Sequence, residues 1–398
     1  MDPRRNPYTP GSGLPPPELS GRSAIIESAG VAIDRIRAGR SARSSILHGL
    51  RGVGKTVLLN QVRLEAEARG IAIVKIKASQ ERSLPAVLVG ALRAAILRLS
   101  RGGVSGDHMR AAMGTLAGFA KARKLTYPDI GFPLHVAPER GLAATGDLDT
   151  DLTEVLLSLG KAARAGETAL VLFIDELHHV ALAELASLIT ALDAARDDQV
   201  PVMLMAAGLP QLAVQTGRAR SYAERLFEFV SLDRLNESDA ASALTVPAAR
   251  QNVVFDPDAI AEILCQTCGY PRFLQEWGKH AWNVAAASPI RIEDISWATD
   301  DALADLDEGF FRVRFDRLTA AEKNYLRAVA ELGHGPHRSG DIAAILQRAV
   351  TTLAPIRRSL MAKGLIYSRA YGETEFTAPL FDGFMKRIMP EFSQATVT

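Results

Sequence analysis

The sequence predicts an α/β fold in which a five-stranded parallel sheet precedes an all-helical segment and a small helix-and-strand domain. Between residues 21 and 235, short β-branched apolar runs alternate with amphipathic helices, as is typical of a parallel sheet covered on both faces. Residues 237–306 are helical in pattern throughout, and three helices and two short strands follow. We therefore expect folded parts at 21–235, 236–307 and 308–392.

Composition favours a globular protein. Hydrophobic residues make up 47% of the 398 residues and charged residues 23%, which excludes wholesale disorder and a collagen-like fibre. Two cysteines cannot form a disulfide framework, and no apolar run approaches the length of a membrane helix. We expect a cytoplasmic protein with no membrane partner. Six prolines in residues 1–20 predict a flexible tail, either disordered or an extended arm.

Five strands are expected in the first part. They are Ser44–His48, Ile71–Lys77, Ala169–Ile174, Val200–Ala206 and Phe227–Leu232. Helices are expected at Leu84–Leu99 and His108–Ala122, between the second and third strands. The segment that follows, within residues 123–147, is rich in Pro and Gly at Thr126–Gly146 and predicts an irregular insertion or hairpin.

A phosphate-binding loop follows the first strand. The motif G-x-x-x-x-G-K-[ST] is matched by Gly49, Leu50, Arg51, Gly52, Val53, Gly54, Lys55 and Thr56. An amphipathic helix follows it, so backbone amides and the helix N-terminus would surround the phosphates of a nucleotide. Lys55 would reach the β- and γ-phosphates, and the Thr56 hydroxyl would bind Mg²⁺. The alternative is a glycine-rich turn with a chance lysine.

An acidic pair, Asp175-Glu176, ends the third strand. In an open α/β sheet, ligands bind at the carboxyl ends of the strands, so Asp175 would bind Mg²⁺ opposite Thr56. Glu176 would act as the general base that polarises the attacking water. The alternative is an acid pair that only stabilises the N-terminus of the next helix.

These two motifs, GLRGVGKT and LVLFIDE, followed by a helical segment, resemble the AAA+ ATPases. The chain is most similar to the branch near the origin-recognition and signal-transduction (STAND) ATPases, over roughly residues 18–390. The resemblance implies ATP and Mg²⁺ as cofactors and a helical lid behind the sheet. It also implies an adenine contact from Arg22, in Ser20-Gly21-Arg22, where the alternative is an ordinary helix cap.

Two further arginines are assigned by the resemblance. Arg225, before the fifth strand, matches the arginine that acts on a neighbouring subunit's nucleotide, although Arg218 and Arg220 compete for that role. Arg272, at a helix start in Gly269–Leu274, matches the sensor 2 arginine. Strand four ends in Ala206-Ala207-Gly208 and lacks the polar sensor 1 residue of the family, which argues against fast hydrolysis. A homo-oligomer is implied.

Two other motifs are not assigned a function. Cys265 and Cys268 form C-x-x-C in a helical pattern without a second pair, which favours buried helix cysteines over a metal site. His178 and His179 follow the acidic pair. On a helix, adjacent side chains point about 100° apart, so we do not expect a shared metal, although His178 is close to the expected active site in sequence.

The last part has the order of a winged helix. Its three helices are Ala320–Glu331, Ser339–Leu346 and Thr352–Lys363, and its two strands are Leu365–Ser368 and Thr374–Thr377. Residues 310–390 carry 13 Lys and Arg against seven Asp and Glu, which favours double-stranded DNA as a partner. The candidate contacts on the third helix are Thr351, Thr352, Arg357 and Arg358. The alternatives are protein contact and, for Arg357, an internal ion pair.

The sequence therefore predicts an ATP-binding, Mg²⁺-dependent AAA+ ATPase whose nucleotide state controls assembly and the engagement of DNA or a partner. The alternative is a STAND-like regulatory switch that binds ATP, hydrolyses it rarely, and uses its winged helix for protein contact.

Overall fold

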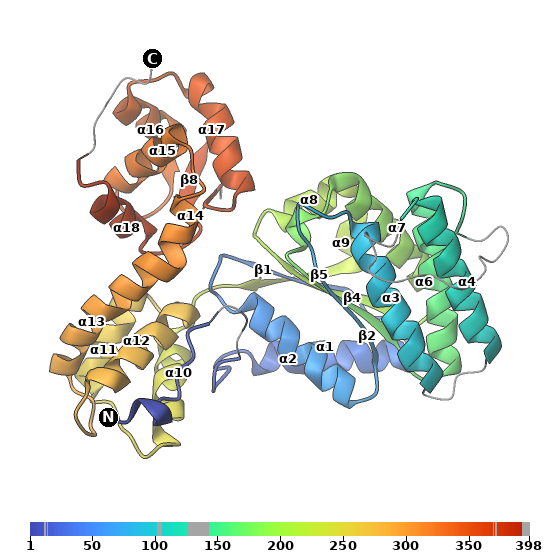
Figure 1. Cartoon of the computed structure of the whole chain (residues 1–398), viewed down its shortest axis with the longest axis horizontal. Helices are drawn as coiled ribbons and strands as arrows, with labels where there is room; N and C mark the ends of the chain where they lie inside the picture. Colours follow the sequence, from blue (N-terminus) through green and yellow to red (C-terminus); the bar gives the residue numbers. More distant parts are fainter. Residues whose placement is uncertain are drawn as a thin grey trace. The chain divides into compact units, whose positions relative to one another are not determined.

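The computed structural model describes residues 1–11, 13, 15–101, 106–125, 143–368, 370 and 372–391. The chain divides into two compact units (Figure 1). One unit contains residues 21–49 and 54–233, and the other contains 1–20, 50–53 and 234–398. The insertion expected at Thr126–Gly146 lies outside the described residues, except for 143–146.

The first unit contains the expected five-stranded sheet. Its strand order is β2-β3-β4-β1-β5, and every pair of neighbours is parallel. The strands are β1 (Ser44–Gly49), β2 (Ala72–Lys77), β3 (Leu170–Asp175), β4 (Val202–Gly208) and β5 (Phe227–Leu232). Each lies within two residues of its predicted bounds. The order places β3 and β1 on either side of β4, so the ends of these three strands lie together.

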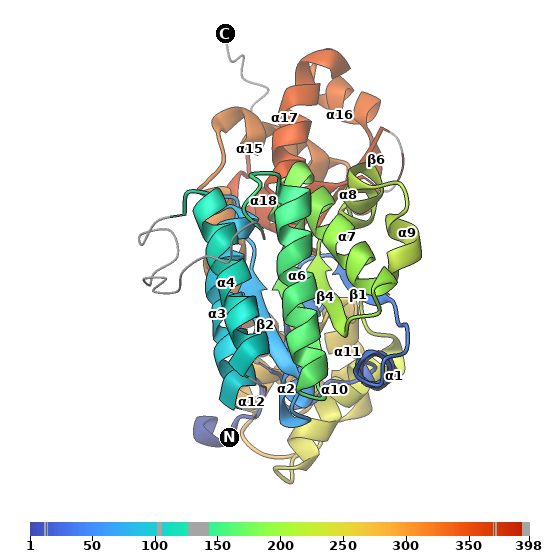
Figure 2. The same ribbon diagram turned by 90° about the vertical axis from the view of Figure 1, so that its right-hand side faces the viewer.

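Helices cover both faces of this sheet. Figures 1 and 2 show α1 and α2 on one face, and α3, α6 and α7 on the other. The bounds are α1 (Ser23–Arg37), α2 (Lys55–Ala68), α3 (Leu84–Arg101), α4 (Gly106–Ala122), α6 (Leu148–Ala165), α7 (Leu182–Asp197), α8 (Leu212–Ala219) and α9 (Ala223–Leu226). Because both faces are covered, the inner strand β3 is buried from Leu170 to Ile174. Helix α6 is absent from the sequence prediction.

Four helices open the second unit and confirm the all-helical segment. They are α10 (Glu237–Ala249), α11 (Pro257–Thr267), α12 (Pro271–Val284) and α13 (Ile292–Leu306). Prolines occupy the first turn of α11 and α12, where a missing amide proton costs no helix hydrogen bond. We refer to α10–α13 as the lid.

The C-terminal part of this unit has winged-helix topology, as expected. A π-helical turn (Asp307–Arg312) and α14 (Val313–Phe315) lead into it. Its elements are α15 (Ala320–Glu331), β6 (His337–Arg338), α16 (Ser339–Leu346), α17 (Val350–Ala362), β7 (Ile366–Tyr367), β8 (Glu373–Phe376) and α18 (Phe381–Ile388). The strands form an antiparallel sheet in the order β6-β8-β7. The prediction lacked β6 and α18, and it began α17 two residues late.

The N-terminal residues pack on the lid, in place of the flexible tail expected for residues 1–20. Tyr8 is only 4% exposed, and its hydroxyl donates to the Leu244 carbonyl. The Asn6 side chain donates to the Lys279 carbonyl over 2.9 Å. A Cβ on Gly278 would lie 2.8 Å from the Tyr8 ring, so the ring rests directly on the backbone of α12. We call the described residues 1–11 the arm.

Among the described residues, no helix combines the length and the apolar character needed to cross a membrane.

Candidate functional site

The phosphate loop joins β1 to α2 and has the backbone conformation that its glycines permit. Gly52 and Gly54 have φ of +88° and +92°, in the region that residues with a Cβ rarely adopt. Helix α2 begins at Lys55, directly after Gly54. Lys55 is 9% exposed, and its ammonium donates to the Gly49 carbonyl over 2.9 Å. A lysine and the positive end of a helix dipole therefore lie at the same loop, a combination suited to phosphate.

The acidic pair meets the loop through Asp175, the last residue of β3. The Thr56 hydroxyl donates to Asp175 Oδ2 over 2.9 Å, and the backbone amide of Glu176 donates to Asp175 Oδ1 over 2.9 Å. Burial raises the pKa of Asp175, and the nearby Glu176 carboxylate raises it further. A cation beside Asp175 would relieve both effects. Hydroxyl and carboxylate oxygens are the ligands that Mg²⁺ prefers, so Thr56 and Asp175 fit this ion.

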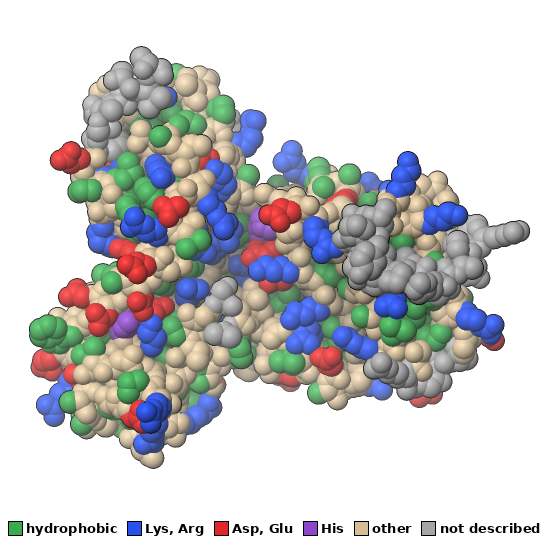
Figure 3. All heavy atoms as spheres, in the orientation of Figure 1, with side chains coloured by type: hydrophobic (Ala, Val, Ile, Leu, Met, Phe, Trp, Pro, Cys, Tyr) green, Lys and Arg blue, Asp and Glu red, His purple; other side chains and the backbone are tan. Residues whose placement is uncertain are grey.

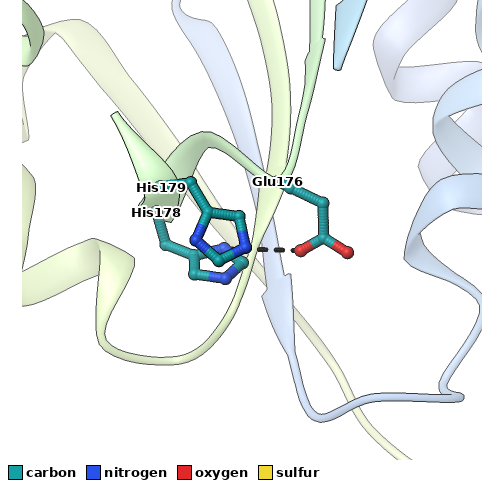
Figure 4. Close-up of side chains that lie close together, drawn as sticks. All are labelled: Glu176, His178 and His179. Carbon is teal, nitrogen blue, oxygen red and sulfur yellow. Dashed lines mark ion pairs between the residues drawn. The ribbon is translucent and has the colours of Figure 1, made fainter. Parts of the chain in front are cut away.

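Glu176 lies beside two histidines whose rings are in close, tilted contact, and the sequence prediction did not place these rings together. Glu176 has φ of +55°, and the 3₁₀ turn Leu177–His179 follows it. The rings of His178 and His179 lie 4.1 Å apart between centroids, and His178 Nδ1 is 3.5 Å from a Glu176 carboxylate oxygen (Figure 4). The two rings are therefore close together, contrary to the expectation that they point apart, and the turn follows the left-handed Glu176 where an α-helix was assumed.

The end of β4 contacts the same histidine. Ala206 and Ala207 are fully buried and carry no polar side-chain group, so the structure offers no sensor 1 residue on this strand. The backbone amide of Leu209 donates to His178 Nδ1 over 3.3 Å. A Cβ on Gly208 would lie 2.6 Å from the Leu212 side chain and 3.3 Å from His178 Nδ1. The strand therefore needs glycine at 208 where it passes the histidine.

The arginines assigned by resemblance take different positions. The Arg22 guanidinium donates to the Asp233 carbonyl over 2.6 Å. Arg225, on α9, and Arg218 are both exposed. Arg220 is paired with the Asp149 carboxylate and donates to the Thr190 hydroxyl over 3.0 Å. This pairing leaves Arg225 and Arg218 as the accessible arginines of the three.

Arg272 lies at the start of α12, beside the phosphate loop's Gly52. Its backbone amide donates to the Gly52 carbonyl over 3.3 Å. Its guanidinium lies over the Phe310 ring, 4.4 Å from the ring centroid. The Arg314 guanidinium lies 4.0 Å from the same centroid. Burial lowers the pKa of Arg272, while the Glu276 carboxylate acts in the opposite direction. In the state described here, Phe310 is the partner of this side chain.

Both cysteines of the C-x-x-C motif are exposed, so the expectation of buried helix cysteines was wrong. Helix α11 ends at Thr267, and Cys268 follows it with φ of +51°. The chain turns at this point, which carries Cys268 out of the helical pattern.

The basic residues of the winged helix divide into internal and external groups. Arg357 donates to the Thr374 hydroxyl over 2.8 Å, and also to Ser368 and the Glu373 carbonyl. It therefore holds α17 to the wing and does not lie on its outer face. Arg358, Thr351 and Thr352 are exposed. Figure 3 shows basic side chains on the visible face of this domain.

A phosphate loop after β1 and an acidic pair after β3, with β4 between these two strands, are the motif pair of P-loop nucleotide-binding proteins. A family model described as an AAA ATPase domain matches residues 18–205. The matched residues include the phosphate loop and the acidic pair, so this part of the chain is similar to AAA ATPase domains. A second model, a domain of unknown function, matches residues 308–385. No curated protein matches the chain.

Several solved structures are similar to the chain. A Walker-type ATPase of Pyrococcus abyssi is 15% identical, with a TM-score of 0.61, over 92% of this chain and 96% of that one. The Aeropyrum pernix Orc1 protein in complex with DNA is 16% identical, with a TM-score of 0.49, over 94% of each chain. The Thermotoga maritima RuvB Holliday junction branch migration motor is 16% identical, with a TM-score of 0.45, over 91% and 95%. At these identities the likeness is one of fold.

Proposed function

We propose that the chain binds ATP with Mg²⁺ and hydrolyses it at the site formed by the phosphate loop, Asp175 and Glu176. The observation that carries the proposal is the hydrogen bond from Thr56 to Asp175, 2.9 Å long. It brings together the hydroxyl and the carboxylate that P-loop proteins use for the metal ion.

Each residue then has a distinct role. The loop amides and Lys55 bind the phosphates, and Thr56 and Asp175 hold the Mg²⁺, which neutralises charge on the β- and γ-phosphate oxygens. Glu176 accepts a proton from the attacking water. Glu176 follows Asp175 directly in sequence, so the general base is next to a Mg²⁺ ligand but is not itself a Mg²⁺ ligand.

Steady-state phosphate release tests this function. We expect Mg²⁺-dependent release from the wild type and none above background from Lys55→Ala or Glu176→Gln. Calorimetry with ATP separates the two variants, because only Lys55→Ala should lose affinity. Release that persists in Glu176→Gln would contradict the role of Glu176.

A nucleotide-gated switch with little turnover is the second candidate, and the end of β4 favours it. Ala206, Ala207 and Gly208 provide no side chain that can hydrogen-bond a γ-phosphate, so one means of stabilising the transition state is missing. A switch would bind ATP tightly and retain it. The two candidates differ in rate, so the amount of ADP formed on the protein distinguishes them.

We further propose that Arg225 acts on the nucleotide of a neighbouring copy, Arg22 contacts adenine and Arg272 approaches the phosphates when nucleotide is bound. The exposure of Arg225 on α9 is compatible with a role in a homo-oligomer. Mixing Arg225→Ala with Glu176→Gln tests the first assignment. Each variant would retain one half of a shared site, so mixed complexes should regain part of the activity that each lacks alone.

We propose double-stranded DNA as the partner of the winged helix, with engagement controlled by the nucleotide state. Support comes from the winged-helix topology and the exposed Arg358 on α17. However, several basic residues are engaged within the domain. Arg357 is bound to the wing, and Lys363 to the Glu322 carboxylate. Protein contact is the alternative, and DNA affinity measured with ATP, with ADP and without nucleotide distinguishes the two.

A further inference from the structure

Glu176, His178 and His179 form a cluster that the ATPase function does not fully use. One potential ligand atom from each residue lies within 4.8 Å of the other two (Figure 4). His178 is buried, and the other two side chains are half-buried. Two imidazoles and one carboxylate are the ligand types of a three-ligand zinc site, in which a fourth position remains open to water.

The spacing of His178 and Glu176 fits a shared metal ion as well as a direct ion pair. His178 Nδ1 and the Glu176 carboxylate oxygen are 3.5 Å apart, longer than a charge-assisted hydrogen bond. Two ligand atoms that each lie about 2.1 Å from a tetrahedral Zn²⁺ are separated by about 3.4 Å. The separation of this nitrogen and oxygen therefore matches one edge of a zinc coordination tetrahedron.

The hydrogen bond from the Leu209 amide fixes the form of His178 that a metal needs. An amide that donates to Nδ1 requires a lone pair on that atom, so the proton of the neutral ring is on Nε2. At 3.3 Å this hydrogen bond is long, and a cation would replace the amide as the partner of the lone pair. Gly208 makes room for the ring, since a Cβ there would lie 3.3 Å from Nδ1.

A second cluster of this type is already occupied by a cationic side chain. Glu276, His280 and Asp305 also bring three ligand atoms together in the lid. The Lys279 ammonium lies 2.9 Å from the Glu276 carboxylate and 2.6 Å from the Asp305 carboxylate. An ammonium between the two carboxylates satisfies their charge and takes the place of a metal. Of the two clusters, the one beside the acidic pair is therefore the candidate.

We propose that Glu176, His178 and His179 bind a divalent transition metal, with Zn²⁺ as the reference ion, and that this metal suppresses ATP hydrolysis. Imidazole favours zinc and its neighbours over Mg²⁺, so the site is chemically separate from the Mg²⁺ ligands Thr56 and Asp175. The suppression rests on the proposed function, because a Glu176 carboxylate bound to zinc cannot accept the proton of the attacking water. ATP binding, which uses the phosphate loop, should be preserved.

Direct zinc binding tests the site without relying on activity. The exposed thiols would also bind zinc, so all measurements use the full chain with Cys265→Ser and Cys268→Ser, free of nucleotide and metal. Calorimetry with Zn²⁺ should detect one site, and Co²⁺ should give the strong visible absorption of a low-symmetry, near-tetrahedral ion. His179→Ala and Glu176→Gln should each weaken zinc binding by about tenfold or more. His179 and Glu176 are half-buried, so these variants are better choices than a change at buried His178.

The matched control is His280→Ala in the lid cluster, which should bind zinc as tightly as the parent. Absence of zinc binding at micromolar concentration would overturn the proposal. Zinc affinity that is unchanged in both His179→Ala and Glu176→Gln would also overturn it, as would loss of zinc affinity in His280→Ala. Phosphate release is measured separately. Zinc should lower it in the parent and a chelator should restore it, whereas the remaining activity of His179→Ala should be insensitive to zinc. If the parent releases no phosphate even without zinc, the proposed hydrolysis fails, and the binding measurements still decide whether the metal site exists.

Discussion

The hydroxyl of Thr56 donates to a carboxylate oxygen of Asp175 over 2.9 Å and joins two segments that are 119 residues apart in sequence. Thr56 lies in the first turn of α2, and Asp175 ends β3. The sheet order makes this contact, because β4 alone separates β3 from β1, the strand that leads into the loop.

Lys55→Ala should weaken ATP binding by about tenfold or more, because it removes a charged donor worth about 1.5–3 kcal/mol. Lys55 is 9% exposed and held to Gly49, so its ammonium is already positioned near the loop. Isothermal titration with ATP and Mg²⁺ measures the loss. The exposed Lys386→Ala serves as a control with unchanged affinity, and equal affinity in both variants would refute the phosphate-loop assignment.

Asp175→Asn should raise the melting temperature of the nucleotide-free protein at neutral pH. Burial and Glu176 raise the pKa of Asp175 in the folded state, so ionisation destabilises the fold as the pH rises through that pKa. The neutral amide removes this cost and still accepts from Thr56. A thermal melt of both proteins at several pH values checks the sign. A lower melting temperature for Asp175→Asn at neutral pH would contradict the assignment.

Arg357→Ala should lower stability, whereas Arg358→Ala should leave stability nearly unchanged. Loss of Arg357 leaves the fully buried Thr374 hydroxyl without this donor, so stability should fall by about 1–3 kcal/mol. Loss of the exposed Arg358 should change stability by less than about 0.5 kcal/mol. If DNA binds α17, Arg358→Ala should also reduce the slope of log affinity against log salt by about one. Urea denaturation and salt-dependent DNA titration measure the two effects. No DNA binding by the wild type at low salt would leave protein contact as the role of the domain.

Glu322 should make the winged helix sensitive to acid. Its burial opposes ionisation, but hydrogen bonds from Lys363, the Thr319 amide and Ser359 outweigh burial and lower its pKa from 4.5 to about 2. A lowered pKa gives stability that is fully present above pH 4.5 and is lost as the pH falls towards about 2. Glu322→Gln should flatten that part of the curve of unfolding free energy against pH. An unchanged pH dependence of the unfolding free energy in Glu322→Gln would show that Glu322 is not the source of the acid sensitivity.

Gly278→Ala should loosen the arm. The added Cβ would lie 2.8 Å from the Tyr8 ring, and overpacking of this kind costs about 1–3 kcal/mol. Gly340→Ala is the matched control, because Gly340 also lies in a helix and has no atom within 4 Å of the added Cβ. Limited proteolysis of residues 1–11 should accelerate in the first variant only. Equal proteolysis rates would contradict the packing of Tyr8 on α12.

The sequence predicted the sheet and the nucleotide motifs because these depend on local patterns. The apolar run before Asp175 and the glycines before Lys55 determine a strand end and a loop within a few residues. The clustering of these motifs followed from a general rule, that ligands bind at the carboxyl ends of parallel strands. These predictions therefore did not depend on any contact between residues far apart in sequence.

The errors and omissions depend on a backbone conformation or on contacts between segments far apart in sequence. The close approach of the His178 and His179 rings follows a left-handed Glu176 and a 3₁₀ turn, and the sequence pattern does not show this backbone conformation. Arg357 looked like a residue of the outer helix face because its partners in the wing follow it by 11 to 17 residues. Tyr8 lies in a proline-rich segment, and only its contact with α10 and α12 identifies it as a core residue.

The most direct measurement of the central claim is the identity of the nucleotide held by the protein after incubation with ATP and Mg²⁺. Acid quenching at successive times reports conversion on the protein itself, so even slow hydrolysis without a sensor 1 residue is detected. We predict that the wild type converts bound ATP to ADP, while Glu176→Gln binds ATP equally well and retains it. ATP that stays intact on the wild type for as long as on Glu176→Gln would contradict hydrolysis at this site.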